Sequence, residues 1–132
     1  MQRTYNYTRS KTTELWHRTL GAGFPCLNID SVEFLGTSPK ALIEYKRFAV
    51  ELWSKTDYQA TALRNLADMA GLPCFLVEYN GELGSANGLT FTIHPLNGLA
   101  LLILEGYNIC EAKPMGELQY TEFLKAIRTV SL

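Results

Sequence analysis

The chain has 132 residues, of which 47% are hydrophobic and 19% are charged, and its formal net charge is −1. This length suits one domain with a single core, and the hydrophobic share excludes a chain that is disordered throughout. No apolar stretch approaches the ~20 residues that a membrane-spanning helix requires, and the N-terminal residues lack the hydrophobic segment of a signal peptide. We therefore expect a single cytosolic domain over residues 1–132, with no membrane partner.

Charge is unevenly distributed along the chain. Residues 1–64 hold nine Lys and Arg against six Asp and Glu, whereas residues 65–132 hold three against seven. A locally positive surface attracts a polyanion even when the total charge is close to zero. Chance asymmetry on a solvated surface explains these counts equally well, so charge alone does not identify a partner.

The cysteines are three in number and widely spaced. An odd count without a CxxC pair argues against a disulfide framework and against a zinc ribbon. We interpret Cys26 and Cys74, each of which follows a proline, as small core residues.

The first residues predict an irregular segment followed by a helix. Residues 1–11 hold Arg3 and Arg9 among tyrosines and polar residues, and we expect a flexible basic arm there. A helix is expected to start at Thr12-Thr13-Glu14, which offers hydroxyl caps and an acid in the first turn. Gly21 lies where this helix is expected to end.

The next segment predicts an antiparallel hairpin. Residues 24–35 and 41–49 are strand-like, and the Gly-Thr-Ser-Pro-Lys segment over residues 36–40 has the composition of a turn. Side chains alternate along a strand, so Glu44 and Lys46 are expected on one face of the second strand.

The rest of the chain alternates between helices and strands. Asp57 and Gly71 are placed to cap a helix between them, with apolar residues at helical spacing. Further in chain order we expect a strand over 73–79, a turn over 80–88, a strand over 89–94, an ambiguous strand or short helix over 98–111, and a helix over 117–130. A hairpin followed by a helix and more strands predicts an α/β fold, with a central mixed sheet flanked by helices.

Two acids end apolar runs in the predicted hairpin. Asp30 follows Leu27–Ile29 and Glu44 follows Ala41–Ile43, with Lys46 two residues further. Acids and a lysine at the ends of adjacent strands are costly to bury without a partner. A divalent metal is the partner that fits, because carboxylates are hard oxygen ligands and an ammonium group positions water or screens charge. This pattern indicates metal-dependent hydrolysis of a phosphodiester.

The order of helix, acid-bearing strand, turn, ExK strand, helix and strand over residues 12–79 resembles the PD-(D/E)xK nuclease superfamily. The resemblance implies a restriction-endonuclease-like fold in which the hairpin carries the site. It implies that Asp30 and Glu44 bind Mg²⁺ or Mn²⁺ and that Lys46 assists the attacking water. Gln59 matches a glutamine that many members carry early in the next helix, where it orients the lysine or a phosphate.

Other residues are candidates for additional roles. Glu14 corresponds to an acid in the first helix of some superfamily members. Arg18 is a phosphate candidate because a guanidinium group binds phosphate in a bidentate way. His17 beside it is a candidate for contact with a phosphate or with the metal site, although a surface position is the favoured interpretation. The residues expected to hold the nucleic-acid backbone are Arg3, Arg9, Arg18 and Arg47.

Each site residue also has a simpler interpretation. Asp30 could end a strand by hydrogen-bonding a turn, and Glu44 with Lys46 could form a pair on a solvated face. Glu33 could replace Asp30 as the ligand, but regular alternation puts the two acids on opposite faces. We prefer Asp30 because the apolar run before it indicates a buried position.

The function that this pattern favours is a divalent-metal-dependent nuclease acting on DNA or RNA, with DNA the favoured substrate and a two-fold dimer the expected assembly. The alternative is a nuclease-fold module with little or no activity that binds nucleic acid or protein, such as a phage or mobile-element accessory protein. A third hypothesis is an assembly protein in which Leu99–Leu104 packs against a partner. The complete acid–acid–lysine set favours the enzyme.

Overall fold

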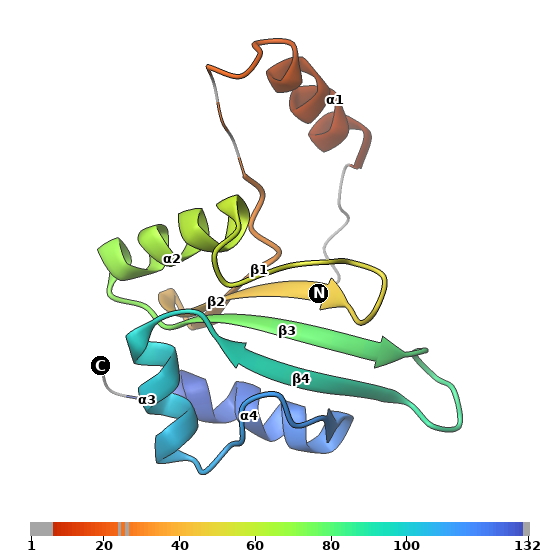
Figure 1. The fold of residues 1–132 in the computed structure, drawn as a ribbon, viewed down its shortest axis with the longest axis vertical. Helices are drawn as coiled ribbons and strands as arrows, with labels where there is room; N and C mark the ends of the chain where they lie inside the picture. Colours follow the sequence, from red (N-terminus) through yellow and green to blue (C-terminus); the bar gives the residue numbers. More distant parts are fainter. Residues whose placement is uncertain (1–6, 24, 26, 131–132) are drawn as a thin grey trace.

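The computed structural model describes residues 7–23, 25 and 27–130, and it is built on a five-stranded sheet (Figure 1). The sheet order is β1-β2-β3-β4-β5; β2 and β3 are parallel and every other neighbouring pair is antiparallel. The strands are β1 (Ser31–Leu35), β2 (Ser38–Arg47), β3 (Cys74–Gly81), β4 (Leu89–Pro95) and β5 (Met115–Gly116). The helices are α1 (Tyr7–Arg18), α2 (Tyr58–Ala70), α3 (Gly98–Gly106) and α4 (Glu117–Thr129). The expected α/β fold with a mixed sheet flanked by helices is confirmed.

Helices cover both faces of the sheet. Figure 1 shows α2 on one side and α3 with α4 on the other. The core under α3 and α4 is the larger one, and its strand residues include Ala41, Ile43, Phe75, Val77 and Ile93. The core under α2 is formed by Leu42, Ala60, Leu63, Ala67, Leu72, Cys74, Leu76 and Leu96. Neighbouring residues of one strand therefore pack into different cores, because successive side chains of a strand point to opposite faces of the sheet.

The helix predicted between Asp57 and Gly71 is confirmed. The Asp57 carboxylate accepts a hydrogen bond of 2.7 Å from the Ala60 N–H, which satisfies one of the free donors of the first turn. Gly71 ends the helix with a φ of 69°, a left-handed conformation that glycine adopts at low cost. These caps fix where α2 begins, and that start matters for the site below.

The prediction of an irregular segment over residues 1–11 was wrong from Tyr7 onward. The helix α1 already begins there and runs through Thr12–Glu14 to Arg18. No glycine or proline interrupts residues 7–18, so the hydroxyl residues lie inside the helix rather than starting it. Figure 1 shows α1 standing apart from the sheet.

The hairpin is confirmed, but its strands have other bounds than expected. β1 starts at Ser31, so residues 27–30 lie outside the strand predicted over 24–35. β2 starts at Ser38, because a tight turn with Gly36 at φ 60° replaces the longer turn predicted over 36–40. β2 ends at Arg47, and Ala49, with φ 62°, has left the extended conformation.

The segment predicted as strand or helix over residues 98–111 begins with the helix α3. Asn97 caps it by accepting from the Ala100 N–H at 3.0 Å, and its side chain also accepts from the Cys74 N–H at 3.0 Å. The short edge strand β5 was not predicted. Within the described residues, no helix combines the length and apolar character that crossing a bilayer requires.

The two cysteines that the structure describes differ in environment. Cys74 is buried in the core under α2, as expected, and burial raises the pKa of its thiol to about 12. Cys110 is exposed. Cys26 lies outside the described residues.

Candidate active site

Asp30 and Glu44 meet at one edge of the face that α2 covers. Glu44 lies on β2 between β1 and β3 and is only 4% exposed. Asp30 directly precedes β1, whose first residue, Ser31, pairs with Ile43 in the antiparallel ladder. The Tyr45 N–H donates a 2.9 Å hydrogen bond to Asp30 Oδ2, which holds the exposed Asp30 side chain against β2.

A chain of hydrogen bonds joins Glu44 to Lys46 through the start of α2. Gln59 Nε2 donates to Glu44 Oε1 at 3.0 Å, and Lys46 Nζ donates to Gln59 Oε1 at 3.0 Å. Gln59 is the second residue of α2, so the Asp57 cap determines where its amide lies. Three separate segments thus bring together the four predicted catalytic residues, which we call the acid–lysine cluster: Asp30, Glu44, Lys46 and Gln59.

The electrostatics of the cluster are unfavourable for a charged Glu44. Burial, followed by the neighbouring Asp30 side chain, raises the pKa of Glu44 to about 8, although the Lys46 ammonium opposes this shift. The second oxygen of the carboxyl group, Oε2, is buried and has no hydrogen-bond partner among the described residues. A cation beside the two acids would satisfy this atom and favour the ionised form.

The donor set fits a magnesium or manganese ion. Mg²⁺ prefers oxygen ligands, and proteins usually hold it through one or two carboxylates while water and phosphate oxygens complete its coordination. The part of the chain that the structure describes contains no group of three or more His, Cys, Asp or Glu side chains placed to hold a metal. If an ion binds at the cluster, Asp30 and Glu44 are the two carboxylates that would hold it.

Glu33, the alternative to Asp30 as a metal ligand, lies away from the acid–lysine cluster. Arg128 Nη2 of α4 donates to Glu33 Oε2 at 2.8 Å, and Glu33 pairs with Ala41 on the face opposite Glu44. The reason given for preferring Asp30 was nevertheless wrong. Ile29 is 37% exposed and Asp30 is exposed, so Asp30 reaches Glu44 from the sheet edge rather than from a buried strand.

Two of the expected nucleic-acid-binding residues, Arg18 and Arg47, have side chains that the structure describes, and neither belongs to the acid–lysine cluster. Arg47 follows Lys46 and therefore faces the other side of the sheet, where it pairs with Glu82 at 3.1 Å and lies 5.8 Å from the Tyr79 ring centroid. His17 and Arg18 lie in the last turn of α1, which Figure 1 shows apart from the sheet.

Three of the candidates cannot be placed as side chains. Arg3 lies outside the described residues. Arg9 and Glu14 belong to α1, but their side chains lie outside what the structure describes. Their expected roles in phosphate or metal binding stay predictions.

Sequence reasoning missed polar residues beside the cluster. Glu78 on β3 is the register partner of Lys46, and His94 Nε2 lies 2.7 Å from Glu78 Oε1. The sequence contains a signal for Glu78, because this acid directly follows the apolar run Cys74–Val77. Glu44 follows the apolar run Ala41–Ile43 in the same way. In the sequence, His94 precedes Pro95 at the end of a predicted strand, a position that favours a structural role. Its partner Glu78 lies on another strand and is not visible in the sequence.

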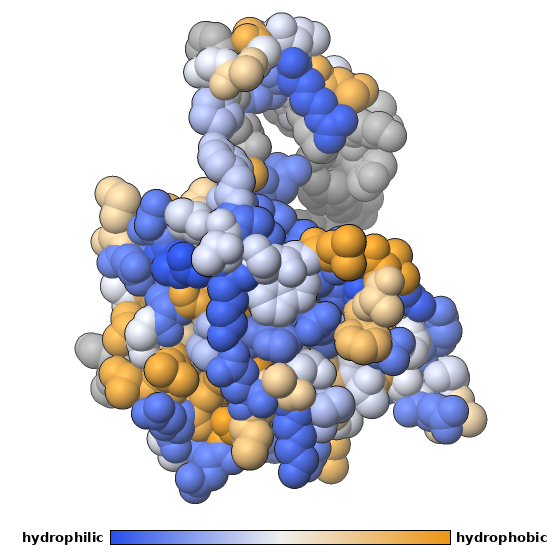
Figure 2. All heavy atoms as spheres, viewed as in Figure 1, coloured by the Kyte–Doolittle hydropathy of each residue, from blue (hydrophilic) through white to orange (hydrophobic). Residues whose placement is uncertain are grey.

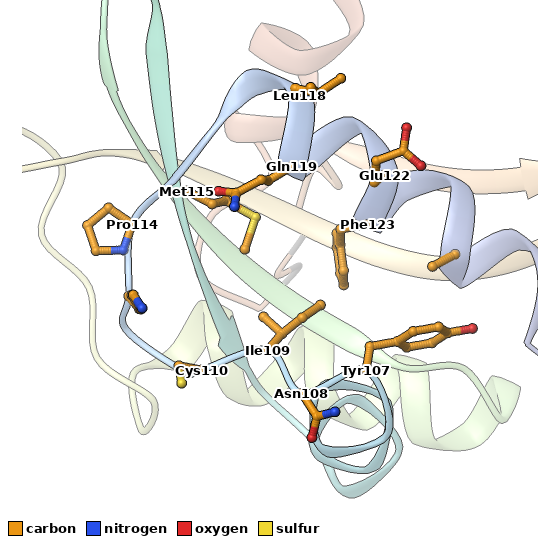
Figure 3. A pocket seen from close by; sticks show the side chains of 12 residues that line it. Tyr107, Asn108, Ile109, Cys110, Pro114, Met115, Leu118, Gln119, Glu122 and Phe123 are labelled. Carbon is orange, nitrogen blue, oxygen red and sulfur yellow. The ribbon is translucent and has the colours of Figure 1, made fainter.

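A separate cavity of about 530 Å³ lies on the other side of the sheet. Figure 3 shows the side chains of Ile109, Met115 and Phe123 directed into the same space between α4 and the segment that follows α3. None of the residues of the acid–lysine cluster lines this cavity.

The apolar segment of the assembly hypothesis is only partly covered. Ile103 and Leu104 are buried against the sheet, whereas Leu101 and Leu102 remain exposed. Figure 2 shows the corresponding hydrophobic surface over α3. Exposed single apolar side chains of this kind are common on protein surfaces and do not identify a partner.

No family model, no curated protein and no solved structure matches this chain. Membership of the PD-(D/E)xK superfamily and the restriction-endonuclease-like fold therefore stay predictions. What the described residues offer is a chemical arrangement, in which two acids lie together, one carboxyl oxygen of Glu44 has no donor, and a glutamine amide joins Glu44 to Lys46.

Proposed function

We propose that the chain is a divalent-metal-dependent nuclease of the PD-(D/E)xK type, which hydrolyses phosphodiester bonds in nucleic acid. The observation that supports this best is the buried Glu44 Oε2, which no described residue donates to and which belongs to a carboxyl group paired with Asp30. A buried polar atom without a partner is costly, and a strongly shifted acid with a specific charged neighbour is typical of functional sites. The order β1-β2-α2-β3, with Asp30 just before β1 and Glu44 on β2, supports the same proposal.

Each residue of the acid–lysine cluster has its own role in the proposed hydrolysis. When bound, Mg²⁺ or Mn²⁺ would polarise a phosphate oxygen and make water a better nucleophile at neutral pH. Asp30 and Glu44 would hold the ion, and the Glu44 carboxyl group would release its proton to solvent on becoming a ligand. The Lys46 ammonium hydrogen-bonds the attacking water or stabilises the negative charge that develops on the phosphoryl group. Gln59 fixes the spacing between Lys46 and Glu44 through its two hydrogen bonds.

DNA is the substrate that we favour, and the proposed assembly is a two-fold dimer. One domain of 132 residues covers a short stretch of duplex, and two copies related by two-fold symmetry present two sites to two strands. Sedimentation of the chain alone and with duplex DNA checks this assembly.

A cleavage assay tests the proposed function. Purified chain is incubated with branched, duplex and single-stranded DNA and with RNA, in Mg²⁺, in Mn²⁺ and in EDTA. We expect cleavage of at least one substrate with either ion and none in EDTA. Glu44→Ala should abolish cleavage, whereas Glu82→Gln, which changes an exposed acid on the β3–β4 connection, should leave it unchanged.

Two results would count against the nuclease. Cleavage that persists in Glu44→Ala would place the chemistry elsewhere or in a contaminant. A wild-type chain that binds nucleic acid but cuts no substrate of the panel would support the binding module instead.

A further inference from the structure

A second polar group continues the row of polar side chains across the sheet. Glu78 on β3 pairs in register with Lys46 on β2, and His94 on β4 pairs with Leu76, which itself pairs with Glu44. Alternation places Glu78 and His94 on the face that carries Glu44 and Lys46. The proposed hydrolysis does not use either residue.

Burial and contacts show that this group is specifically arranged. His94 is 9% exposed, and its Nε2 lies 2.7 Å from Glu78 Oε1. The ring of Trp53 lies against the imidazole, with 4.8 Å between ring centroids and 59° between the ring planes. Trp53 also packs against the apolar core under α2. Buried polar groups are costly unless paired, so the pair constrains both of its members and the ring that covers them.

Trp53 belongs to the loop that joins the two halves of the acid–lysine cluster. This loop runs from the end of β2, just after Lys46, to the start of α2, just before Gln59. At its first end the Phe48 N–H donates to the Tyr79 carbonyl at 2.8 Å, and near its second end the Ser54 N–H donates to Asp57 Oδ2 at 3.0 Å. Between these ends, the Trp53 ring contacts the His94 imidazole of β4.

We propose that Glu78, His94 and Trp53 are positioning residues that hold the β2–α2 loop in place, so that Gln59 keeps Lys46 joined to Glu44. This inference rests on the proposed nuclease function. Glu78 fixes the imidazole of His94, the imidazole supports the Trp53 ring, and the ring sets the loop and the first turn of α2. Small displacements of catalytic groups reduce rates strongly, which makes this remote support important for cleavage.

A rate comparison of substitutions at His94 and Trp53 tests the inference. His94→Ala and Trp53→Leu should each reduce the single-turnover cleavage rate about tenfold or more, while the dissociation constants for nucleic acid and Mn²⁺ stay within about twofold. His94→Gln keeps a group that donates to Glu78 and should recover most of the rate. Ile93→Val is the matched control, because it changes the preceding residue of β4 on the opposite face.

Fluorescence provides a readout that does not depend on activity. The chain has two tryptophans, so Trp16→Phe leaves Trp53 as the reporter. In this background His94→Ala should shift the Trp53 emission to longer wavelength and increase its quenching by acrylamide, and His94→Gln should do so less. All rates are measured well below the thermal midpoint of each variant, so that the folded fraction is the same.

The possible outcomes separate the two proposals. If His94→Ala cleaves nucleic acid as fast as wild type although Trp53 is exposed in the variant, the positioning role is overturned. The nuclease proposal is not affected by that result. Equal losses in His94→Ala, His94→Gln and Ile93→Val would also overturn the positioning role, because they would reflect general destabilisation. A wild type that cuts nothing would overturn the nuclease, and the positioning role with it.

Discussion

The two faces of the sheet use the same strands for different purposes. On the α3–α4 face, Ile43, Phe75 and Ile93 are buried in a continuous apolar core. On the α2 face, apolar residues such as Leu42 give way to Glu44 within two positions of the same strand. The larger apolar core therefore lies on one face, and the acid–lysine cluster lies where the apolar core of the other face ends.

The difference follows from how far α2 extends over the sheet. Its buried residues Ala60, Leu63 and Ala67 pack on the apolar half of the face. Beyond them, the side chain of Gln59 provides hydrogen bonds to Glu44 and Lys46, and Trp53 of the β2–α2 loop packs beside the apolar core. Substitutions on the two faces should consequently separate stability from activity.

The largest expected effect is a loss of stability on the α3–α4 face. Phe75 is fully buried and packs edge-on against Phe123, with 5.1 Å between ring centroids. Phe75→Ala should lower the free energy of unfolding by about 3–5 kcal/mol, through lost burial and the cavity left behind. Urea denaturation measures it, with Leu102→Ala on the exposed side of α3 as a control expected within about 0.5 kcal/mol of wild type. A Phe75→Ala loss no larger than that of the control would contradict this division of the faces.

The α2 face should show the opposite effect, a gain in stability that depends on pH. The pKa of Glu44 is raised from 4.5 to about 8 by burial and Asp30, so between these pH values the folded chain holds a proton that the unfolded chain releases. The stability of the metal-free wild type should therefore fall as pH rises through this range. Glu44→Gln should remove this fall and be more stable than wild type above about pH 8, by up to about 4 kcal/mol.

Urea denaturation in EDTA across this pH range measures the effect. Below about pH 4.5 the carboxyl group is protonated in both states, so the pH-dependent gain of Glu44→Gln should vanish there. Parallel stability curves for wild type and Glu44→Gln over the whole range would show that Glu44 titrates normally.

A smaller effect, on rate rather than stability, is expected at Lys46. Lys46→Ala should lower the cleavage rate about 10²-fold, because the ammonium acts on water and developing charge. Its Mn²⁺ affinity should change little, since Lys46 is not a ligand. Arg47→Ala is the matched control, because its side chain lies on the opposite face and pairs with Glu82. Equal rate losses in the two variants would indicate a general effect of basic charge.

The smallest effect concerns the cap that fixes the start of α2. Asp57→Ala removes the hydrogen bonds to the Ala60 and Ser54 N–H groups and should cost about 1 kcal/mol of stability. Because Gln59 lies in the same turn, the cleavage rate should also fall, whereas Asp57→Asn should restore most of both. Thermal denaturation and single-turnover cleavage measure the two quantities. A stability loss without any loss of rate would separate the cap from the site.

Local patterns in the sequence were sufficient to predict α2, its two caps and the shared face of Glu44 and Lys46. Each of these depends on residues close in the chain, namely Asp57, Gly71 and the alternation along β2. The exposed approach of Asp30 and the early start of α1 were not predicted, because propensity does not fix element ends.

The contacts of Glu78 and His94 were beyond sequence reasoning for a different reason. They depend on the register of β2 with β3 across a helical crossover and of β3 with β4, and this register is a property of the whole sheet. The pairing of Glu33 with Arg128 likewise joins residues that lie 95 positions apart in the sequence. Alternation assigned Glu33 to a face, but it did not reveal its partner.

The most direct test of the central claim is a calorimetric titration with Mn²⁺ at about pH 7, in two buffers that differ in ionisation enthalpy. The account predicts that wild type binds Mn²⁺ and releases about one proton per ion, because Glu44 must ionise to become a ligand. Glu44→Gln should lose this binding, and Glu82→Gln should retain it. Two results would contradict the assignment of Asp30 and Glu44 as a metal site. One is that wild type does not bind Mn²⁺. The other is that Glu44→Gln binds Mn²⁺ as tightly as wild type, without releasing a proton.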